Sequence, residues 1–153
     1  MKKIALFTIF AMLFTTLTVT VTTSSACASD SHAKDVKSEG FNLIHVADLE
    51  QWLKTESDNV HVFDANNEST RTKEGVIPTA QALPSSSHYD VATLPADKNS
   101  KVVFYCANTS CMASHDAAKV AVKAGYKNVF VMADGIQGWK KAGKPTQKFD
   151  KKG

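Results

Sequence analysis

The segment 101–106, with the sequence KVVFYC, constrains the fold more than any other part of this chain. Its near-continuous apolar run is typical of a central strand of a parallel sheet, because such a strand is buried on both faces. A small polar loop follows, and the Ala-rich segment 114–125 then predicts a helix that ends at Gly125. Ligands of such α/β units bind at the carboxyl ends of the strands, so the loop that starts at Cys106 is a candidate site.

The rest of the sequence continues this alternation of strands and helices. Its apolar periodicity predicts strands at 41–46, 60–65 and 128–132, and helices at 47–55 and 135–143. Residues 66–84 have the composition of a loop, and residues 85–100 can hold at most a short helix. The predicted fold class is therefore α/β, with a parallel sheet flanked by helices.

The N-terminus indicates export. Two lysines precede an apolar block over residues 4–14, and the small residues at 26–28 form an Ala-Cys-Ala site. A charged start, an apolar core and a small-residue site are typical of a secretory signal peptide. We therefore expect residues 1–28 to be a cleaved signal peptide and the mature protein to be periplasmic or secreted. The alternatives are an uncleaved membrane anchor and a lipoprotein attached through Cys27.

Removal of the signal peptide leaves enough chain for one domain with a single core. We expect residues 29–40 to be a flexible lead-in, residues 41–148 to form the domain, and residues 149–153 to be a short tail. The loss of two lysines lowers the formal net charge of +3 by two units, so nothing in the charge predicts binding to nucleic acid. After cleavage we expect no stable insertion into a membrane.

Two cysteines remain in the mature chain, Cys106 and Cys111. An even pair in an oxidising compartment usually forms a disulfide. The position of Cys106 favours a different use, because it lies between a buried strand and the N-terminus of a helix. The dipole of that helix favours negative charge, so the pKa of the thiol is expected to fall below its usual value of about 8.5. Whether the pair is bonded stays open.

These segments together resemble the rhodanese superfamily of sulfurtransferases. The resemblance covers most of residues 41–145 and rests on VHVFDA with Asp64, on GVIPTAQALP, on VVFYC with its loop and helix, and on AGYKNVFVMADGIQGWKKAGKP. It implies a three-layer α/β/α fold with a central, mainly parallel sheet. It also implies a sulfurtransferase whose catalytic nucleophile, Cys106, takes sulfane sulfur as a persulfide and passes it to an acceptor.

The resemblance also implies the partners of the reaction. The donor would be polysulfide, a small persulfide or, less readily, thiosulfate, and the acceptor a thiol, which can belong to a protein, or cyanide. No organic cofactor is needed, because the chemistry takes place at sulfur. Backbone N–H groups of the loop are expected to face the substrate sulfur, and the substrate-binding residues are then Ala107, Asn108, Thr109, Ser110, Cys111 and Met112.

Several positions depart from the family pattern. Val76, Thr79 and Asp134 replace a usual His, Gly and Gly, and Asn66 replaces an Arg that often follows the aspartate. The loop CANTSCMAS contains neither lysine nor arginine, so we expect thiosulfate to be a poor donor. A cysteine phosphatase needs an arginine six residues after its nucleophile to bind phosphate in a bidentate manner. Met112 stands at that position, which argues against a phosphatase.

Other polar residues receive structural interpretations. Asp64 is expected to be structural and to fix loops by accepting backbone N–H bonds, whereas Arg71 is expected to be solvated. Ser114 is a candidate cap for the helix after the loop.

The alternatives to sulfur transfer involve the same cysteines. Cys106, Cys111 and His115 are spaced like metal ligands, but a structural zinc site normally has four ligands. No fourth ligand is evident, so we expect no metal. In the sulfurtransferase, Cys111 would be a secondary thiol. Two other classes stay open, which are a thiol–disulfide redox protein that uses both cysteines and a catalytically silent binding module.

Overall fold

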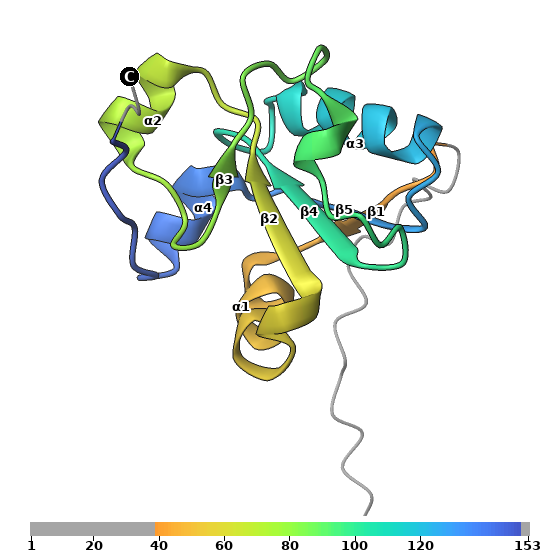
Figure 1. The fold of residues 1–153 in the computed structure, drawn as a ribbon. Helices are drawn as coiled ribbons and strands as arrows, with labels where there is room; N and C mark the ends of the chain where they lie inside the picture. Colours follow the sequence, from red (N-terminus) through yellow and green to blue (C-terminus); the bar gives the residue numbers. More distant parts are fainter. Residues whose placement is uncertain (1–38, 151–153) are drawn as a thin grey trace, which may run out of the picture. The chain divides into compact units, whose positions relative to one another are not determined.

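The structure, a computed structural model, describes residues 39–150. Its centre is a sheet of five parallel strands in the order β1-β5-β4-β2-β3 (Figure 1). β4 lies in the middle, as the sequence predicts, but it ends one residue before Cys106. The strands are β1 (Asn42–Ile44), β2 (Val60–Asp64), β3 (Gln81–Ala82), β4 (Lys101–Tyr105) and β5 (Asn128–Met132).

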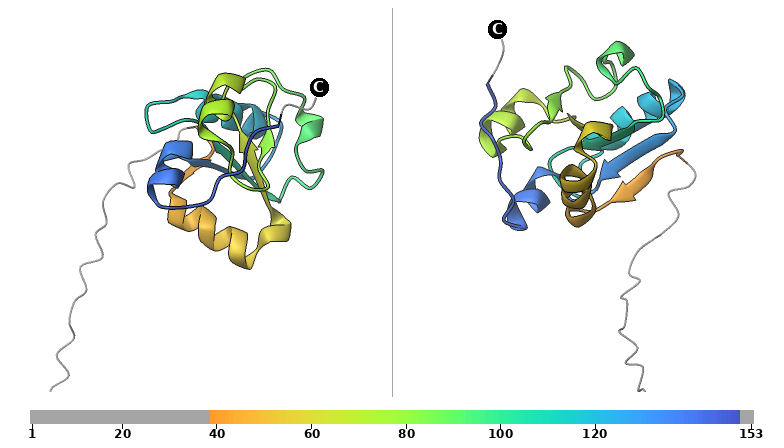
Figure 2. Two further views of the ribbon diagram at one scale, coloured as in Figure 1. Left: turned by 90° about the vertical axis from the view of Figure 1, so that its left-hand side faces the viewer. Right: turned by 60° about the horizontal axis from the view of Figure 1, so that its bottom comes forward.

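Helices cover both faces of this sheet. α1 (Val46–Thr55) and α4 (Gly135–Lys141) pack on one face, and α3 (Ala113–Lys123) packs on the other. Figures 1 and 2 show α1 and α3 on opposite sides of the strands. The predicted α/β fold with helices on both faces of a parallel sheet is therefore confirmed.

The side chains of β4 explain why its sequence is apolar throughout. Val102 and Phe104 belong to the core under α3, whereas Val103 and Tyr105 belong to the core under α1 and α4. All four side chains are fully buried. Alternate residues of a strand point to opposite faces, so a strand covered on both faces needs apolar residues at every position.

The segment 66–84 differs from the expectation, because it contains a helix and a strand. α2 (Glu68–Glu74) begins after Asn67, whose side-chain oxygen accepts a hydrogen bond from the Thr70 N–H at 2.8 Å. It ends at Gly75, whose φ of +77° favours glycine. The sequence of α2 is polar, so no apolar stripe indicated a helix. The prediction of a loop over this segment was wrong.

Other boundaries move by a few residues. The strand predicted at 41–46 is shorter than expected and comprises only β1. It ends before His45, because His45 caps α1 and its backbone N–H donates to the Asp48 carboxylate at 2.8 Å. The 3-10 turns η1 (Ser57–Asn59) and η2 (Val91–Thr93) occupy connecting segments.

The predicted signal peptide and Cys27 lie outside the described residues, as does most of the predicted lead-in. Within residues 39–150, no helix has both the length and the apolar character needed to cross a membrane.

Candidate active site around Cys106

Cys106 lies directly after β4, at the carboxyl edge of the sheet, and only 2% of the residue is exposed. Its backbone carbonyl accepts a hydrogen bond from the Ile136 N–H at 2.8 Å. Its side chain contacts the start of α3, where the Ser114 hydroxyl lies 3.2 Å from the Cys106 Sγ. The chain therefore holds one buried thiol between the central strand and the first turn of a helix.

The loop after Cys106 turns carbonyl oxygens toward the sulfur. The Cys106 thiol donates to the Cys111 carbonyl at 3.0 Å, and the Asn108 carbonyl lies 4.0 Å away. The N–H groups of Ser110 and Cys111 are instead used within the loop, where they donate to the Asn108 side chain and the Asn108 carbonyl. The expected inward arrangement of these two N–H groups is therefore not observed. The loop holds a neutral thiol.

Burial controls the protonation of this thiol. It raises the pKa of Cys106 to about 11, and a hydrogen bond with the Cys111 side chain adds to the increase. The Ser114 hydroxyl and the Ser114 backbone N–H lower the pKa, but by less than burial raises it. The expected fall of the pKa was therefore wrong, because desolvation outweighs the field of the helix N-terminus.

The six loop residues from 107 to 112 follow Cys106 and differ in exposure. Ala107, Asn108 and Cys111 are half-buried, whereas Thr109, Ser110 and Met112 are exposed. The Met112 side chain forms an apolar spot at the rim, with 53% of the residue exposed. Cys106 and Cys111 are both free thiols. The structure therefore brings two reduced sulfurs into one loop.

The N-terminus of α4 fixes this loop from the other side. The Gln137 N–H donates to the Ala107 carbonyl at 3.0 Å, and the side chains of Asn108 and Gln137 are hydrogen-bonded at 3.2 Å. Gly135 has a φ of +64°, and a Cβ atom there would lie 2.5 Å from the Ala107 carbonyl carbon. Only glycine allows so close an approach. The sequence did not reveal this contact, because it joins segments far apart in the chain.

Asp134, which replaces a usual glycine, has a structural use. Its carboxylate lies 3.1 Å from the His45 Nδ1 and accepts the Val46 N–H at 3.1 Å. It thereby links the start of α1 to the start of α4.

Asp64 lies at the end of β2, next to the site, and is fully buried. It accepts the Asn66 N–H at 2.7 Å and the Tyr105 hydroxyl at 2.6 Å, and Arg71 Nε lies 3.3 Å from its carboxylate. Arg71 is itself buried and donates to the carbonyls of Asp64 and Leu83. The expectation of a solvated Arg71 was therefore wrong. The buried charge of Asp64 needs a cation, and α2, which the sequence did not predict, supplies it.

Ser114 is the residue whose role sequence reasoning missed. It was a candidate cap for α3, but Met112 holds the cap position and Ser114 lies inside the helix. The Ser114 side chain is buried against the Cys106 sulfur instead. A hydroxyl in the first turn after a cysteine loop is the sequence signal that could have indicated this contact.

His115 does not join the cysteines in a metal site. Its ring packs edge-on against Phe41, with 5.5 Å between ring centroids, and burial lowers its pKa. Among the described residues, no three His, Cys, Asp or Glu side chains are grouped so as to hold a metal ion.

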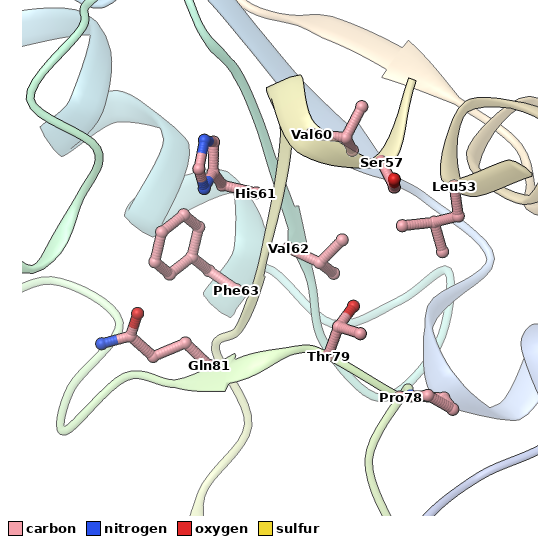
Figure 3. A pocket seen from close by; sticks show the side chains of 9 residues that line it. All are labelled: Leu53, Ser57, Val60, His61, Val62, Phe63, Pro78, Thr79 and Gln81. Atoms are coloured by element: carbon pink, nitrogen blue, oxygen red, sulfur yellow. The ribbon is translucent and has the colours of Figure 1, made fainter. Parts of the chain in front are cut away.

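A groove of about 420 Å³ lies along β2, away from the Cys106 loop (Figure 3). It follows the edge of β2 that β3 leaves open, since β3 pairs only with Phe63 and Asp64. Thr79, at a position where the family pattern has glycine, borders the groove with a φ of +71°. No cysteine lines this groove. Its lining consists of Leu53, Ser57, Val60, His61, Val62, Phe63, Pro78, Thr79 and Gln81.

Both the sequence and the fold of this chain are similar to those of known proteins. A model of the rhodanese-like domain family matches residues 45–142. Among solved structures, a protein from Bacillus halodurans has a TM-score of 0.62 at 24% identity, with 73% of this chain and 80% of that chain covered. Thiosulfate sulfurtransferase from Pseudomonas aeruginosa has a TM-score of 0.61 at 19% identity, with 74% of this chain and 21% of that chain covered.

A third solved structure, a possible tyrosine phosphatase from Rhodopseudomonas palustris, has a TM-score of 0.58 at 22% identity, with 76% of this chain and 97% of that chain covered. These likenesses show the fold. Among curated proteins, the catalytic subunit of human DNA polymerase zeta is 42% identical over 52 residues, which is 33% of this chain. This chain spans only 2% of that polymerase, and the same holds for the mouse enzyme.

Proposed function

Since the chain belongs to the family of rhodanese-like domains, we propose that it is a sulfurtransferase that carries sulfane sulfur as a persulfide on Cys106. The position of Cys106 is the observation that carries this proposal. The thiol lies at the carboxyl end of the central strand, buried and within 3.2 Å of the Ser114 hydroxyl. This is where parallel α/β folds place their reacting groups.

The reaction begins with the loss of the Cys106 proton, since the thiolate is the nucleophile. The thiolate attacks a terminal sulfur of the donor, a new S–S bond forms at Cys106, and the S–S bond of the donor breaks. The shortened donor leaves with the electron pair of the broken bond. An acceptor thiolate then attacks the outer sulfur, and Cys106 leaves as the thiolate. The Ser114 hydroxyl can donate to the anionic sulfur in both steps. The loop residues 107–112 form the wall of this site.

The uncharged loop supports polysulfide or a small persulfide as the donor, and a thiol as the acceptor. Residues 106–114 contain no cationic side chain, so the two negative charges of thiosulfate find no partner in the loop. A cation near such an anion would give charge-assisted hydrogen bonds.

Steady-state transfer to a thiol acceptor tests this function. We expect turnover with polysulfide, much slower turnover with thiosulfate, and no turnover in the Cys106→Ser variant. Equal rates with thiosulfate would contradict the donor assignment, and an active Cys106→Ser variant would contradict the nucleophile. Hydrolysis of an aryl phosphate serves as a control and is expected to be absent, because Met112 stands where a phosphatase needs arginine.

We also infer that the protein is exported. The support comes from the charged start, the apolar block and the Ala-Cys-Ala site at the N-terminus. N-terminal sequencing of protein from the native host is expected to begin at Ser29. A chain that keeps Met1 would contradict cleavage, and a lipid on Cys27 would identify a lipoprotein instead.

A further inference from the structure

The loop brings the Cys111 backbone into contact with the Cys106 sulfur. The turn closed by the Cys111 N–H and the Asn108 carbonyl, 3.0 Å apart, folds Cys111 back toward the strand end. The Cys111 carbonyl then contacts the Cys106 Sγ at 3.0 Å. The Cys111 side chain also acts on the Cys106 thiol, and it is one cause of the raised pKa of Cys106. Both sulfurs are reduced.

Cys106 and Cys111 differ in their exposure to solvent, and this difference suggests different roles. Cys106 is only 2% exposed, so a bulky acceptor has little direct access to it. Cys111 is half-buried and stands beside the exposed Met112 at the rim. The thiol nearest to a persulfide on Cys106 is therefore supplied by the protein itself. A group held in place in this way reacts as if it were highly concentrated.

We propose that Cys111 discharges the Cys106 persulfide as hydrosulfide, so that the protein has a persulfide reductase activity in addition to sulfur transfer. This inference rests on the proposed function, because it requires the persulfide. It assigns Cys111 a catalytic role, since its sulfur attacks the reacting sulfur atom.

The reaction balances without an outside oxidant. The Cys111 sulfur attacks the Cys106 Sγ, a Cys106–Cys111 disulfide forms, and the bond between Sγ and the outer sulfur breaks. The outer sulfur leaves as hydrosulfide with the bonding electron pair and the proton of the Cys111 thiol. Over loading and discharge together, the two cysteine thiols are oxidised to a disulfide and the sulfane sulfur is reduced to hydrosulfide. A dithiol reductant, small or protein-borne, must then reduce the disulfide by thiol–disulfide exchange.

A single-turnover experiment on the full chain tests this step. Wild type and Cys111→Ser are both made with Cys27→Ser, so that no third thiol contributes. Each is treated with polysulfide, desalted, and followed by intact mass and by a hydrosulfide assay without reductant. The persulfide adds about 32 Da, whereas the disulfide leaves the chain about 2 Da lighter than the reduced protein.

We expect the wild-type persulfide to decay to the disulfide with one hydrosulfide released per chain. The rate should not depend on protein concentration, because the step is intramolecular. Cys111→Ser should keep its added mass at least about tenfold longer, since it lacks the positioned thiol. A dithiol should restore the reduced wild-type mass.

Each other outcome is informative. If both proteins gain the mass and lose it at the same rate, or if the wild type keeps it, the discharge by Cys111 is contradicted and the sulfurtransferase stands. If neither protein gains the mass, the proposed function itself fails. If the added mass moves onto Cys111, seen by fragmentation of the tryptic peptide 102–119, the reductase step is contradicted in favour of a relay of sulfur between the two cysteines.

Discussion

At Cys106, burial and reactivity act against each other. A thiol that is 2% exposed is protected from solvent, and the same burial raises its pKa to about 11. Ser114 is the contact that opposes this increase most strongly. The resting site therefore holds a neutral thiol at neutral pH, and a reacting site must stabilise the thiolate.

The first prediction concerns the pH dependence of Cys106 alkylation. A pKa of about 11 means that the thiolate is scarce at pH 7 and increases as the pH approaches that value. A rise of the pKa from about 9 to about 11 lowers the fraction of thiolate at pH 7 by about a hundredfold. A thiolate of higher pKa is also a stronger nucleophile, which recovers about tenfold of that loss in rate. Alkylation at pH 7 should be about tenfold slower than that of a free cysteine. Mass spectrometry of iodoacetamide-treated protein measures this, and a rate that levels off below pH 8 would contradict it.

The second prediction concerns Ser114. Replacing it with alanine removes a hydrogen bond to the developing thiolate, and such bonds to charged groups contribute about 1.5–3 kcal/mol. We expect persulfide formation to slow by about tenfold or more and the alkylation profile to move to higher pH. Ser114→Thr should restore much of both. Lys123→Ala, an exposed change on the same helix, is the control. An unchanged pH profile in Ser114→Ala would assign the serine a packing role only.

The sequence predicted where Cys106 lies but not how it is protonated. The apolar run before it and the helix after it place it at the edge of a sheet. Its pKa depends on burial, on the Cys111 side chain and on Ser114, and no motif states these contacts. The expectation that the start of α3 would lower the pKa of Cys106 took account of the helix dipole but not of the desolvation of the thiol.

Among the elements, α4 and α2 support the site in ways that the sequence showed only in part. The amphipathic pattern predicted α4, but its use as a clamp on the loop depends on two backbone hydrogen bonds, from Ile136 and Gln137. α2 is polar, so its pattern did not predict a helix. Its buried Arg71 contacts Asp64. This contact could not be inferred from the sequence, because it depends on how α2 packs next to the end of β2.

The third prediction tests the clamp. Gly135→Ala would place a Cβ atom 2.5–2.6 Å from backbone atoms of Ala107 and Asn108, so the loop must move. We expect slower persulfide formation and a loss of stability of about 1–3 kcal/mol. Gly143→Ala is the matched control, since Gly143 also has a positive φ but no atom within 4 Å of its Cβ position.

Urea denaturation and polysulfide loading measure the two effects of the Gly135 substitution. If Gly135→Ala and Gly143→Ala behave alike, the cost comes from backbone strain and not from contact with the loop.

At the scale of the molecule, the alternation of strands and helices was enough to predict a parallel sheet flanked by helices. It did not predict the strand order β1-β5-β4-β2-β3, because pairing between strands depends on how the helices and loops pack. The lack of charge in the loop was visible in the sequence and remains the main argument against thiosulfate as the donor. The buried contacts of Ser114 and Arg71 were not visible, since each joins segments that meet only after folding.

The most direct test of this account is the site of persulfide formation after polysulfide treatment. The Cys111→Ser variant is suited to it, because an internal discharge cannot remove the cargo. Intact mass should increase by about 32 Da, and fragmentation of the tryptic peptide 102–119 should place that sulfur on Cys106. No added mass, or the same added mass in a protein that also carries Cys106→Ser, would contradict the claim that Cys106 carries sulfane sulfur.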